Sequence, residues 1–213
     1  MVVIPLVKKR KSLEGKTVIG IDEFNNGFSF SYGLPMIIVS YLIRDFPNRS
    51  NIPNAKYEKK RGILSKTPKG EEEFQKRARY YLNQNPNFKY TLLEKNPNSY
   101  LMLIERAQAI RSLILANIYD KKLDPLELVI AMDIIDEKGR SQIVAEELDR
   151  LLYDDRLSVK FYFQCHGEDH NVAIKKADRA AYYLAGLRKF KPKGKWPHVL
   201  KRVPLDFKVI QND

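Results

Sequence analysis

The stretch Thr17–Phe24 (TVIGIDEF) is an apolar run that closes on two adjacent acids. Its β-branched residues favour a buried strand. The apolar pattern breaks sharply at Asp22 and Glu23, where polar side chains take over. The stretch therefore predicts a strand of the core that delivers two carboxylates to one end of a sheet.

Two further β-rich runs follow closely along the chain. Phe28–Ser31 and Met36–Ile43 both favour strands, and with Thr17–Phe24 they predict an antiparallel meander. Asp45–Lys60 is rich in Asn, Pro and charge, which predicts a loop or excursion.

Downstream, helical and β patterns alternate. Helices are predicted over Glu71–Leu82, Asn98–Tyr119, Ser141–Tyr153 and His170–Leu187, and strands over Phe88–Leu93, Leu126–Met132 and Ser158–Gln164. Alternation predicts parallel pairing with right-handed crossovers, whereas the opening meander predicts an antiparallel edge. We therefore expect an α/β fold, a mixed sheet of an antiparallel meander plus parallel strands, flanked by helices.

Length and composition limit the class of protein. The chain has 213 residues, 44% of them hydrophobic, which suits one domain over residues 1–187 with a basic extension over 188–213. No apolar run is long enough to cross a bilayer. Apolar Met1–Val7 precedes its basic cluster, which is the wrong order for a secretory signal. Cys165 is the only cysteine, which excludes an internal disulfide and favours the cytoplasm.

The formal net charge of +12 is the most informative bulk property. A strongly basic protein suggests a polyanionic partner, and nucleic acid is the commonest one. An anionic membrane surface is the alternative, but no segment has the apolar and basic faces of an anchor helix. Charge by itself indicates nucleic acid without establishing it.

Four acids are candidates for a shared site. Asp22 and Glu23 end the first predicted strand, and Asp133 ends the strand after the longest helix. If these strands are parallel neighbours, their carboxyl ends open at the same edge of the sheet, where α/β sheets bind ligands. Asp178 has apolar residues four positions away on either side, so it can face the sheet from the last helix.

Carboxylates that converge in this way repel one another unless cations neutralise them. Hard oxygen ligands suit Mg²⁺ or Mn²⁺. Two such ions about 3.5–4 Å apart can activate water and stabilise the leaving oxygen in phosphodiester cleavage. The alternative is that strand-end acids are solvated loop residues, and spacing alone leaves both interpretations open.

Val18–Gly27 (VIGIDEFNNG) opens a series of segments whose order is informative. The others are Ile63–Lys66 (ILSK), Ile104–Ile114 (IERAQAIRSLI), Leu128–Asp133 (LVIAMD) and Ala173–Arg179 (AIKKADR). In order and spacing the series resembles the motifs of type 2 ribonuclease H (ribonuclease HII), a branch of the ribonuclease H-like superfamily. The resemblance covers residues 17 to 187.

This resemblance implies a ribonuclease H-like fold and a metal-dependent endonuclease acting on RNA, an RNA–DNA hybrid or structured nucleic acid. It implies that four catalytic acids bind Mg²⁺ or Mn²⁺, namely Asp22, Glu23, Asp133 and Asp178. It also implies substrate contacts from the turn after the second acid and from the segment before the first helix, at Asn25, Asn26, Gly27, Ser65 and Lys66.

The segments depart from the family at three points. Asn25-Asn26-Gly27 stands where the family has Gly-Arg-Gly, which helps recognise a ribonucleotide 2′-hydroxyl. Leu64 stands where the family has Asp, and no Gly follows Asp133. Specific recognition of a DNA–RNA junction thus lacks its usual residues. The alternative function is a non-catalytic nucleic-acid-binding module with the same fold. A phosphatase or an assembly factor explains the charge less well.

The chain after Gly186 is basic and interleaved with aromatic residues. Such a segment can follow a phosphate backbone while its rings stack on bases, or it can simply solubilise the protein. The substrate contacts expected from it are Lys189, Lys191, Lys193 and Lys195.

Two histidines, His166 and His170, fall in one predicted turn. They suit a transition-metal site or a proton-transfer role beside the acids. The plainer interpretation is a polar turn in which Asp169 caps the last helix, and the spacing matches no strong zinc pattern.

Overall fold

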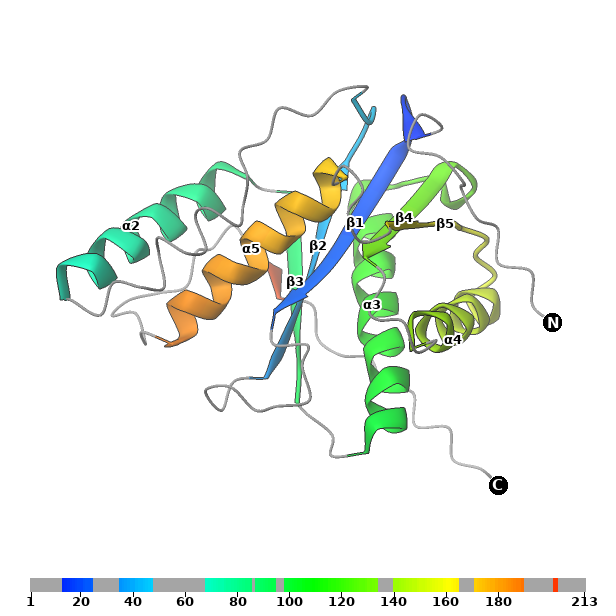
Figure 1. The fold of residues 1–213 in the computed structure, drawn as a ribbon. Helices are drawn as coiled ribbons and strands as arrows, with labels where there is room; N and C mark the ends of the chain where they lie inside the picture. The colour runs from blue at the N-terminus through cyan, green and yellow to red at the C-terminus, as the bar shows by residue number, and fades with distance from the viewer. Residues whose placement is uncertain are drawn as a thin grey trace.

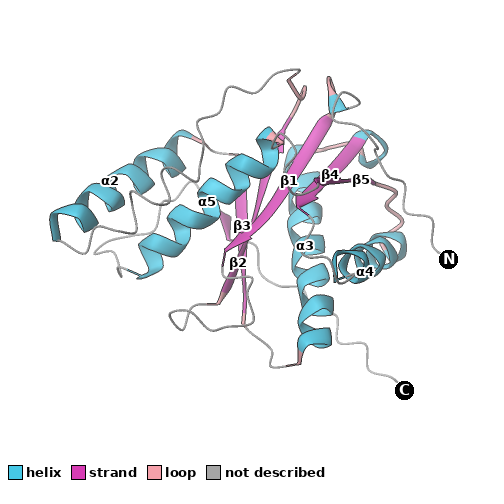
Figure 2. Ribbon diagram, viewed as in Figure 1, coloured by secondary structure: helices cyan, strands magenta, loops and turns pink. Residues whose placement is uncertain are grey.

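The computed structural model describes residues 13–24, 35–47, 68–85, 87–94, 98–133, 140–164, 171–189 and 201–202. In these ranges the chain forms an α/β fold, a mixed sheet with helices on both faces (Figures 1 and 2). The predicted fold class is confirmed. None of the described helices is long and apolar enough to cross a membrane.

The sheet has the strand order β5-β4-β1-β2-β3-β6. Neighbours pair antiparallel at β1–β2 and β2–β3, and parallel at β1–β4, β4–β5 and β3–β6. The five longer strands therefore run 3-2-1-4-5, an order consistent with a ribonuclease H-like fold. The strands are β1 (Thr17–Phe24), β2 (Met36–Ile43), β3 (Phe88–Leu93), β4 (Leu128–Asp133), β5 (Lys160–Gln164) and β6 (Lys201–Arg202).

The antiparallel part of the sheet consists of β1, β2 and β3. β2 pairs with β1 along one edge and with β3 along the other. The sequence did not predict the pairing of β2 with β3. All six residues of β3 are buried, which suits an inner position. Residues 28–31 and most of the predicted excursion lie outside the described ranges.

Two helices cover each face of the sheet in the described part of the chain (Figure 1). Alternation along β1 sorts the core into two layers. Ile19 and Ile21 pack in the layer of α3 and α4, whereas Val18 packs in the layer that includes α5. The helices are α2 (Pro68–Gln84), α3 (Ser99–Lys121), α4 (Arg140–Asp154) and α5 (Val172–Lys189).

The predicted helices and strands lie close to where the sequence placed them. Asn98 caps α3, since its side chain accepts hydrogen bonds from the backbone N–H groups of Tyr100 and Leu101 at 3.0 and 3.2 Å. The helix ends at Lys121, and the C-cap residue Lys122 adopts a left-handed conformation with φ of 50°. Because α3 contacts both the sheet and α4, it buries apolar residues on more than one side.

Helix α5 approaches the middle of β1 at Gly20. A Cβ atom on Gly20 would lie 2.2 Å from the carbonyl carbon of Ala173 and 2.5 Å from the backbone nitrogen of Ile174. Only glycine permits this backbone-to-backbone approach. The contact fixes where the first turn of α5 lies on the sheet.

The extension predicted from residue 188 is partly docked on the sheet. Helix α5 continues to Lys189. Further on, Lys201 and Arg202 form the short strand β6, which pairs parallel with β3. The remaining residues after 189 lie outside the described ranges.

Candidate functional site

The carboxyl ends of β1 and β4 meet at one edge of the sheet. The two strands are parallel neighbours, as predicted, and Ile21 is paired with Met132. The next residues along the two strands are Asp22 and Asp133. Parallel pairing therefore places these two acids side by side.

The adjacent acids Asp22 and Glu23 point to opposite faces of the sheet. Across β2, Asp22 is paired with Val39 and Glu23 with Ile38. Paired residues share a face of the sheet. Val39 packs with α2 and α5, whereas Ile38 packs with α3. Asp22 therefore faces α5, and Glu23 faces α3.

Asp133 shares the face of Asp22. Met132 of β4 packs in the layer of α3 and α4, whereas Ala131 packs in the layer of α5. Because side chains alternate along a strand, Asp133 lies on the side of Ala131. The strands thus direct two carboxylates toward α5.

Helix α5 brings Asp178 to the same place. Gly20 and Asp22 lie on one face of β1, about 7 Å apart along the strand. Ala173, which contacts Gly20, and Asp178 are separated by about 7.5 Å of helix rise. Asp178 is half-buried, as expected for a residue that faces the sheet. The close contact at Gly20 is what allows the helix to carry this acid to the strand ends.

The charges of all three other acids act on the carboxylate of Asp22. Its removal from water is the largest cause that raises the pKa of Asp22 well above its ordinary value. The charges of Asp178, Glu23 and Asp133, in that order, raise the same pKa further. A hydrogen bond from the Glu23 N–H to Asp22 Oδ1, at 2.7 Å, acts in the opposite direction. The four predicted acids therefore lie within electrostatic reach of one carboxylate.

Glu23 is held by an arginine of α3. Arg106 Nε donates to Glu23 Oε1 at 2.6 Å, and a second guanidinium nitrogen donates to Oε2. The two side chains are only 8% and 4% exposed, respectively. This bidentate arrangement is the strongest geometry for a carboxylate and a guanidinium.

The donor set at this edge suits a hard cation in chemistry. Asp22, Asp133 and Asp178 offer only carboxylate oxygens, and a divalent ion would relieve their mutual repulsion. Within the described ranges, however, no three Asp, Glu, His or Cys side chains are arranged to hold an ion as they stand. Metal binding by the four acids stays a prediction.

Most predicted substrate contacts lie outside the part of the chain that the structure describes. Lys189 is the last residue of α5. The two histidines also fall outside the described ranges, as does most of the net positive charge. The undescribed substrate contacts are Asn25, Asn26, Gly27, Ser65, Lys66, Lys191, Lys193 and Lys195.

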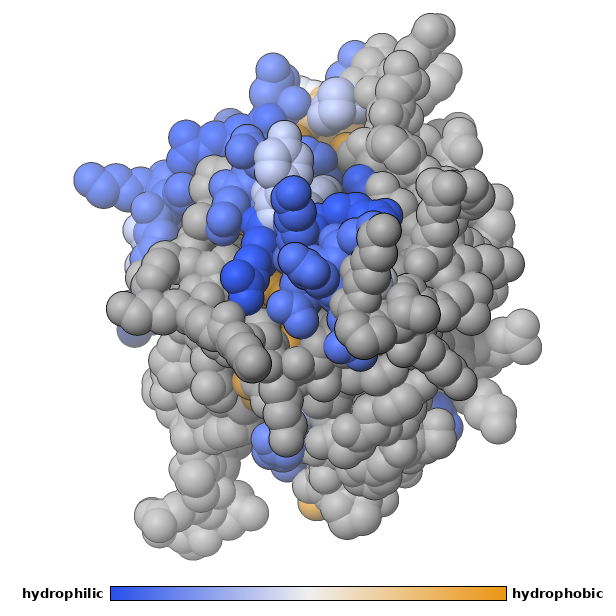
Figure 3. Space-filling view, turned by 90° about the vertical axis from the view of Figure 1, so that its left-hand side faces the viewer, coloured by the Kyte–Doolittle hydropathy of each residue, from blue (hydrophilic) through white to orange (hydrophobic). Residues whose placement is uncertain are grey.

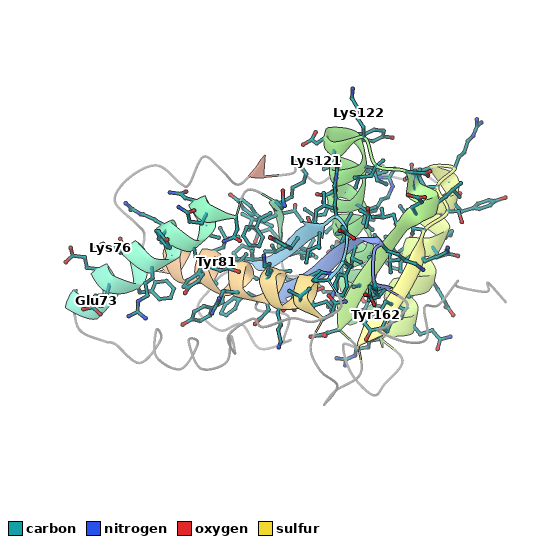
Figure 4. The ribbon with its side chains drawn as sticks, turned by 90° about the horizontal axis from the view of Figure 1, so that it is seen from above. Glu73, Lys76, Tyr81, Lys121, Lys122 and Tyr162 are labelled. Atoms are coloured by element: carbon teal, nitrogen blue, oxygen red, sulfur yellow. The ribbon has the colours of Figure 1, made fainter. Side chains whose placement is uncertain are left out.

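Basic side chains accompany Asp178 along α5, which carries five Lys or Arg residues and one acid. Two of them bind within the protein. Lys176 Nζ donates to the Tyr41 hydroxyl at 2.8 Å and lies 4.7 Å from the ring centroid. The Arg179 guanidinium lies 5.1 Å from the ring of Tyr81, which sits between α2 and α5 (Figure 4).

The outer surface of α2 is hydrophilic but mixed in charge. Among the described residues that are visible from this side, most are hydrophilic (Figure 3). Its exposed residues include Glu72, Glu73, Lys76 and Arg77. Arg77 Nη2 lies 3.6 Å from Glu73 Oε2. Opposite charges along one helix face neutralise each other, so this surface makes a poor phosphate-binding patch.

Arg106 is the site residue that sequence analysis missed. It lies among buried residues of α3, three positions from Leu103 and from Ala109. A cation in an apolar stripe indicates a buried acidic partner, because an unpaired buried charge is costly. That signal was present in the segment IERAQAIRSLI, but it does not say which acid is the partner.

No family model matches the chain, and no curated protein matches it. The class that the fold and site define is an α/β protein with a mixed sheet in ribonuclease H-like order. Its acids gather at the carboxyl ends of two parallel strands, where such sheets bind ligands.

Proposed function

We propose that the protein is a divalent-metal-dependent nuclease that hydrolyses phosphodiester bonds in RNA, an RNA–DNA hybrid or structured nucleic acid. The observation that carries this proposal is the gathering of Asp22, Asp133 and Asp178 on one face of the sheet, where burial and like charge raise the pKa of Asp22. With Glu23, these are the acids that match the type 2 ribonuclease H motifs in the sequence.

In this proposal Mg²⁺ or Mn²⁺ supplies the activation of water and the stabilisation of the leaving oxygen. The chain supplies the ligands. Asp22 and Asp133 would hold the ions from two neighbouring strands, and Asp178 would complete the set from α5. The Glu23 N–H, 2.7 Å from Asp22 Oδ1, restricts how the Asp22 carboxylate can turn.

The substrate class follows from charge and from the departures in the sequence. The formal charge of +12 favours a polyanion. Asn25-Asn26-Gly27 replaces the arginine-bearing turn of the family, so we do not extend the proposal to a strict preference for DNA–RNA junctions. The basic residues after 188 would contact the phosphate backbone.

A panel of labelled substrates tests the proposal. We expect cleavage of at least one of single-stranded RNA, RNA–DNA hybrid and branched DNA in Mg²⁺ or Mn²⁺, and none in chelator. Asp22→Asn should abolish this cleavage while the circular dichroism spectrum stays unchanged. Undiminished cleavage by Asp22→Asn would remove the assignment.

A non-catalytic nucleic-acid-binding module is the second candidate. Two observations favour it: the altered turn at Asn25-Asn26, and the lack of three described side chains already arranged to hold an ion. Fluorescence anisotropy with the same substrates, during a Mn²⁺ titration, separates the two functions. Tight binding without cleavage at any Mn²⁺ concentration would favour the second candidate.

A further inference from the structure

We propose that Glu23 and Arg106 are positioning residues that hold the metal-site acid Asp22, and that Glu23 is not itself a metal ligand. This inference rests on the proposed function, and it divides the four acids into three ligands and one support. The observation behind this inference is that β1 directs the adjacent carboxylates of Asp22 and Glu23 to opposite faces of the sheet.

Glu23 already has a charged partner within the protein. Both of its carboxylate oxygens accept hydrogen bonds from the Arg106 guanidinium, and its side chain is 4% exposed. The pair lies in the layer of α3, across the sheet from Asp178. For Glu23 to reach an ion on the other face, it would have to leave Arg106 as a buried, uncompensated cation.

The Arg106–Glu23 pair is linked to Asp22 through the backbone. The N–H of Glu23 donates to Asp22 Oδ1 at 2.7 Å. The same residue is fixed on its other sides by pairing with Ile38 of β2 and by the Arg106 contact. Arg106 therefore reaches Asp22 indirectly, because it fixes the residue whose amide orients the Asp22 carboxylate.

The Arg106–Glu23 pair also affects the charge of the site. A guanidinium that binds both oxygens of Glu23 offsets part of its negative charge. The carboxylates directed toward α5 are those of Asp22, Asp133 and Asp178. Arg106 thus contributes to both the geometry and the net charge of the site.

Mn²⁺ binding to the full chain, measured by calorimetric titration, tests this division. Asp22→Asn, Asp133→Asn and Asp178→Asn should each weaken Mn²⁺ binding by more than about a hundredfold. Glu23→Gln should weaken it by less than about threefold, since the amide oxygen still accepts from Arg106. Weakening by Glu23→Gln to the level of Asp22→Asn would overturn the inference and make Glu23 a ligand.

A reciprocal exchange gives an independent readout. Glu23→Arg and Arg106→Glu should each weaken Mn²⁺ binding, and the double variant should recover it to within about tenfold of wild type. A guanidinium cannot bind a cation, so recovery is incompatible with a ligand at position 23. A folded double variant that fails to recover overturns the positioning role. If the double variant does not fold, Glu23→Gln decides.

The proposed function can fail separately. If the wild-type chain binds no Mn²⁺, both the metal-dependent function and the inference built on it are wrong. If the wild type binds Mn²⁺ and all four acids behave alike, only the division of roles is wrong.

Discussion

The two faces of the sheet bury charge in opposite ways. In the layer of α3, buried or partly buried cations lie against acids, in the pairs Arg106–Glu23, Arg111–Asp155 and Lys89–Asp120. On the face of α5, the acids Asp22, Asp133 and Asp178 gather instead, and their charges help to raise the pKa of Asp22. A single strand, β1, contributes a carboxylate to each arrangement.

The difference separates structural charge from functional charge. A buried carboxylate with a guanidinium on both oxygens is satisfied within the chain, and removing its partner is what costs stability. A carboxylate placed among other carboxylates is destabilising without a cation. In the proposed function, bound cations would compensate these carboxylates.

The largest expected effect comes from removing an acid on the α5 face. Asp178→Asn should lower cleavage by at least about a thousandfold, because one ligand of the proposed ions is lost. The unfolding free energy should stay the same or rise, because a like charge is removed from beside Asp22. Single-turnover cleavage and urea unfolding measure the two quantities. Asp154→Asn, at an exposed acid of α4, is the matched control and should cleave normally.

The next effect concerns the paired face. Arg106→Met should lower the free energy of unfolding by about 3–5 kcal/mol, because it leaves Glu23 buried without its partner. Urea unfolding in chelator measures the loss. The double variant with Glu23→Gln should recover part of it, and a loss below about 1 kcal/mol in the single variant would contradict the compensated role of this pair.

A smaller effect is expected where α5 rests on β1. Gly20→Ala should cost about 1–3 kcal/mol, since the new Cβ would meet the backbone of Ala173. Gly186→Ala is the comparison, because there the atoms nearest to the Cβ would belong to the Phe74 ring rather than to the backbone. Gly20→Ala should also weaken Mn²⁺ binding by moving Asp178. Unchanged stability in Gly20→Ala would show that α5 lies further from β1.

The pH dependence of stability tests the acids on the α5 face, while the ion pairs on the α3 face stay unchanged. The folded state raises the pKa of Asp22, so it binds that proton more tightly than the unfolded chain does. In chelator, this carboxyl should therefore lower stability as pH rises from its ordinary pKa through the raised one. Asp22→Asn should flatten that slope, and saturating Mn²⁺ should offset it. Thermal unfolding across pH 4 to 8 measures both; equal slopes in wild type and Asp22→Asn would contradict the raised pKa.

The smallest effect is expected at an exposed ion-pair network. Arg150 contacts Glu147 and Asp154 on α4, and its side chain is 45% exposed. Arg150→Gln should change the free energy of unfolding by less than about 1 kcal/mol, because water screens exposed pairs. Urea unfolding of Arg150→Gln and Arg106→Met shows how much burial adds to the effect of losing an ion pair. Equal losses of unfolding free energy in the two variants would show that burial makes no difference.

Much of the fold was predictable because burial leaves local patterns. The bounds of β1, β2 and β3 matched the prediction, since each segment is rich in β-branched, aromatic or other apolar residues and is flanked by polar residues or Pro. The parallel pairing of β1 with β4 followed from alternation of helices and strands. The pairing of β2 with β3 was not predicted, because the two strands are far apart in the sequence.

The sequence predicted that the four acids lie near one another, but not which residues contact each of them. Asp22, Asp133 and Asp178 could be chosen as strand-end and helix acids, and the fold brings them near one another. The opposite facing of Glu23 follows from alternation, but its partner does not: Arg106 is 83 residues away along the chain. Sequence patterns give the face of a side chain, whereas the identity of its neighbour requires the packed structure.

Alternation along β1 makes the arrangement of these acids depend on the register of the strand. A shift of one residue against β2 and β4 would turn Glu23 toward α5 and Asp22 toward Arg106. The same shift would bring a side-chain-bearing residue under Ala173, where only Gly20 fits. β1 is hydrogen-bonded on both edges, so its register is shared with β2 and β4. Gly20, which has no side chain, therefore determines that Asp22 rather than Glu23 faces α5.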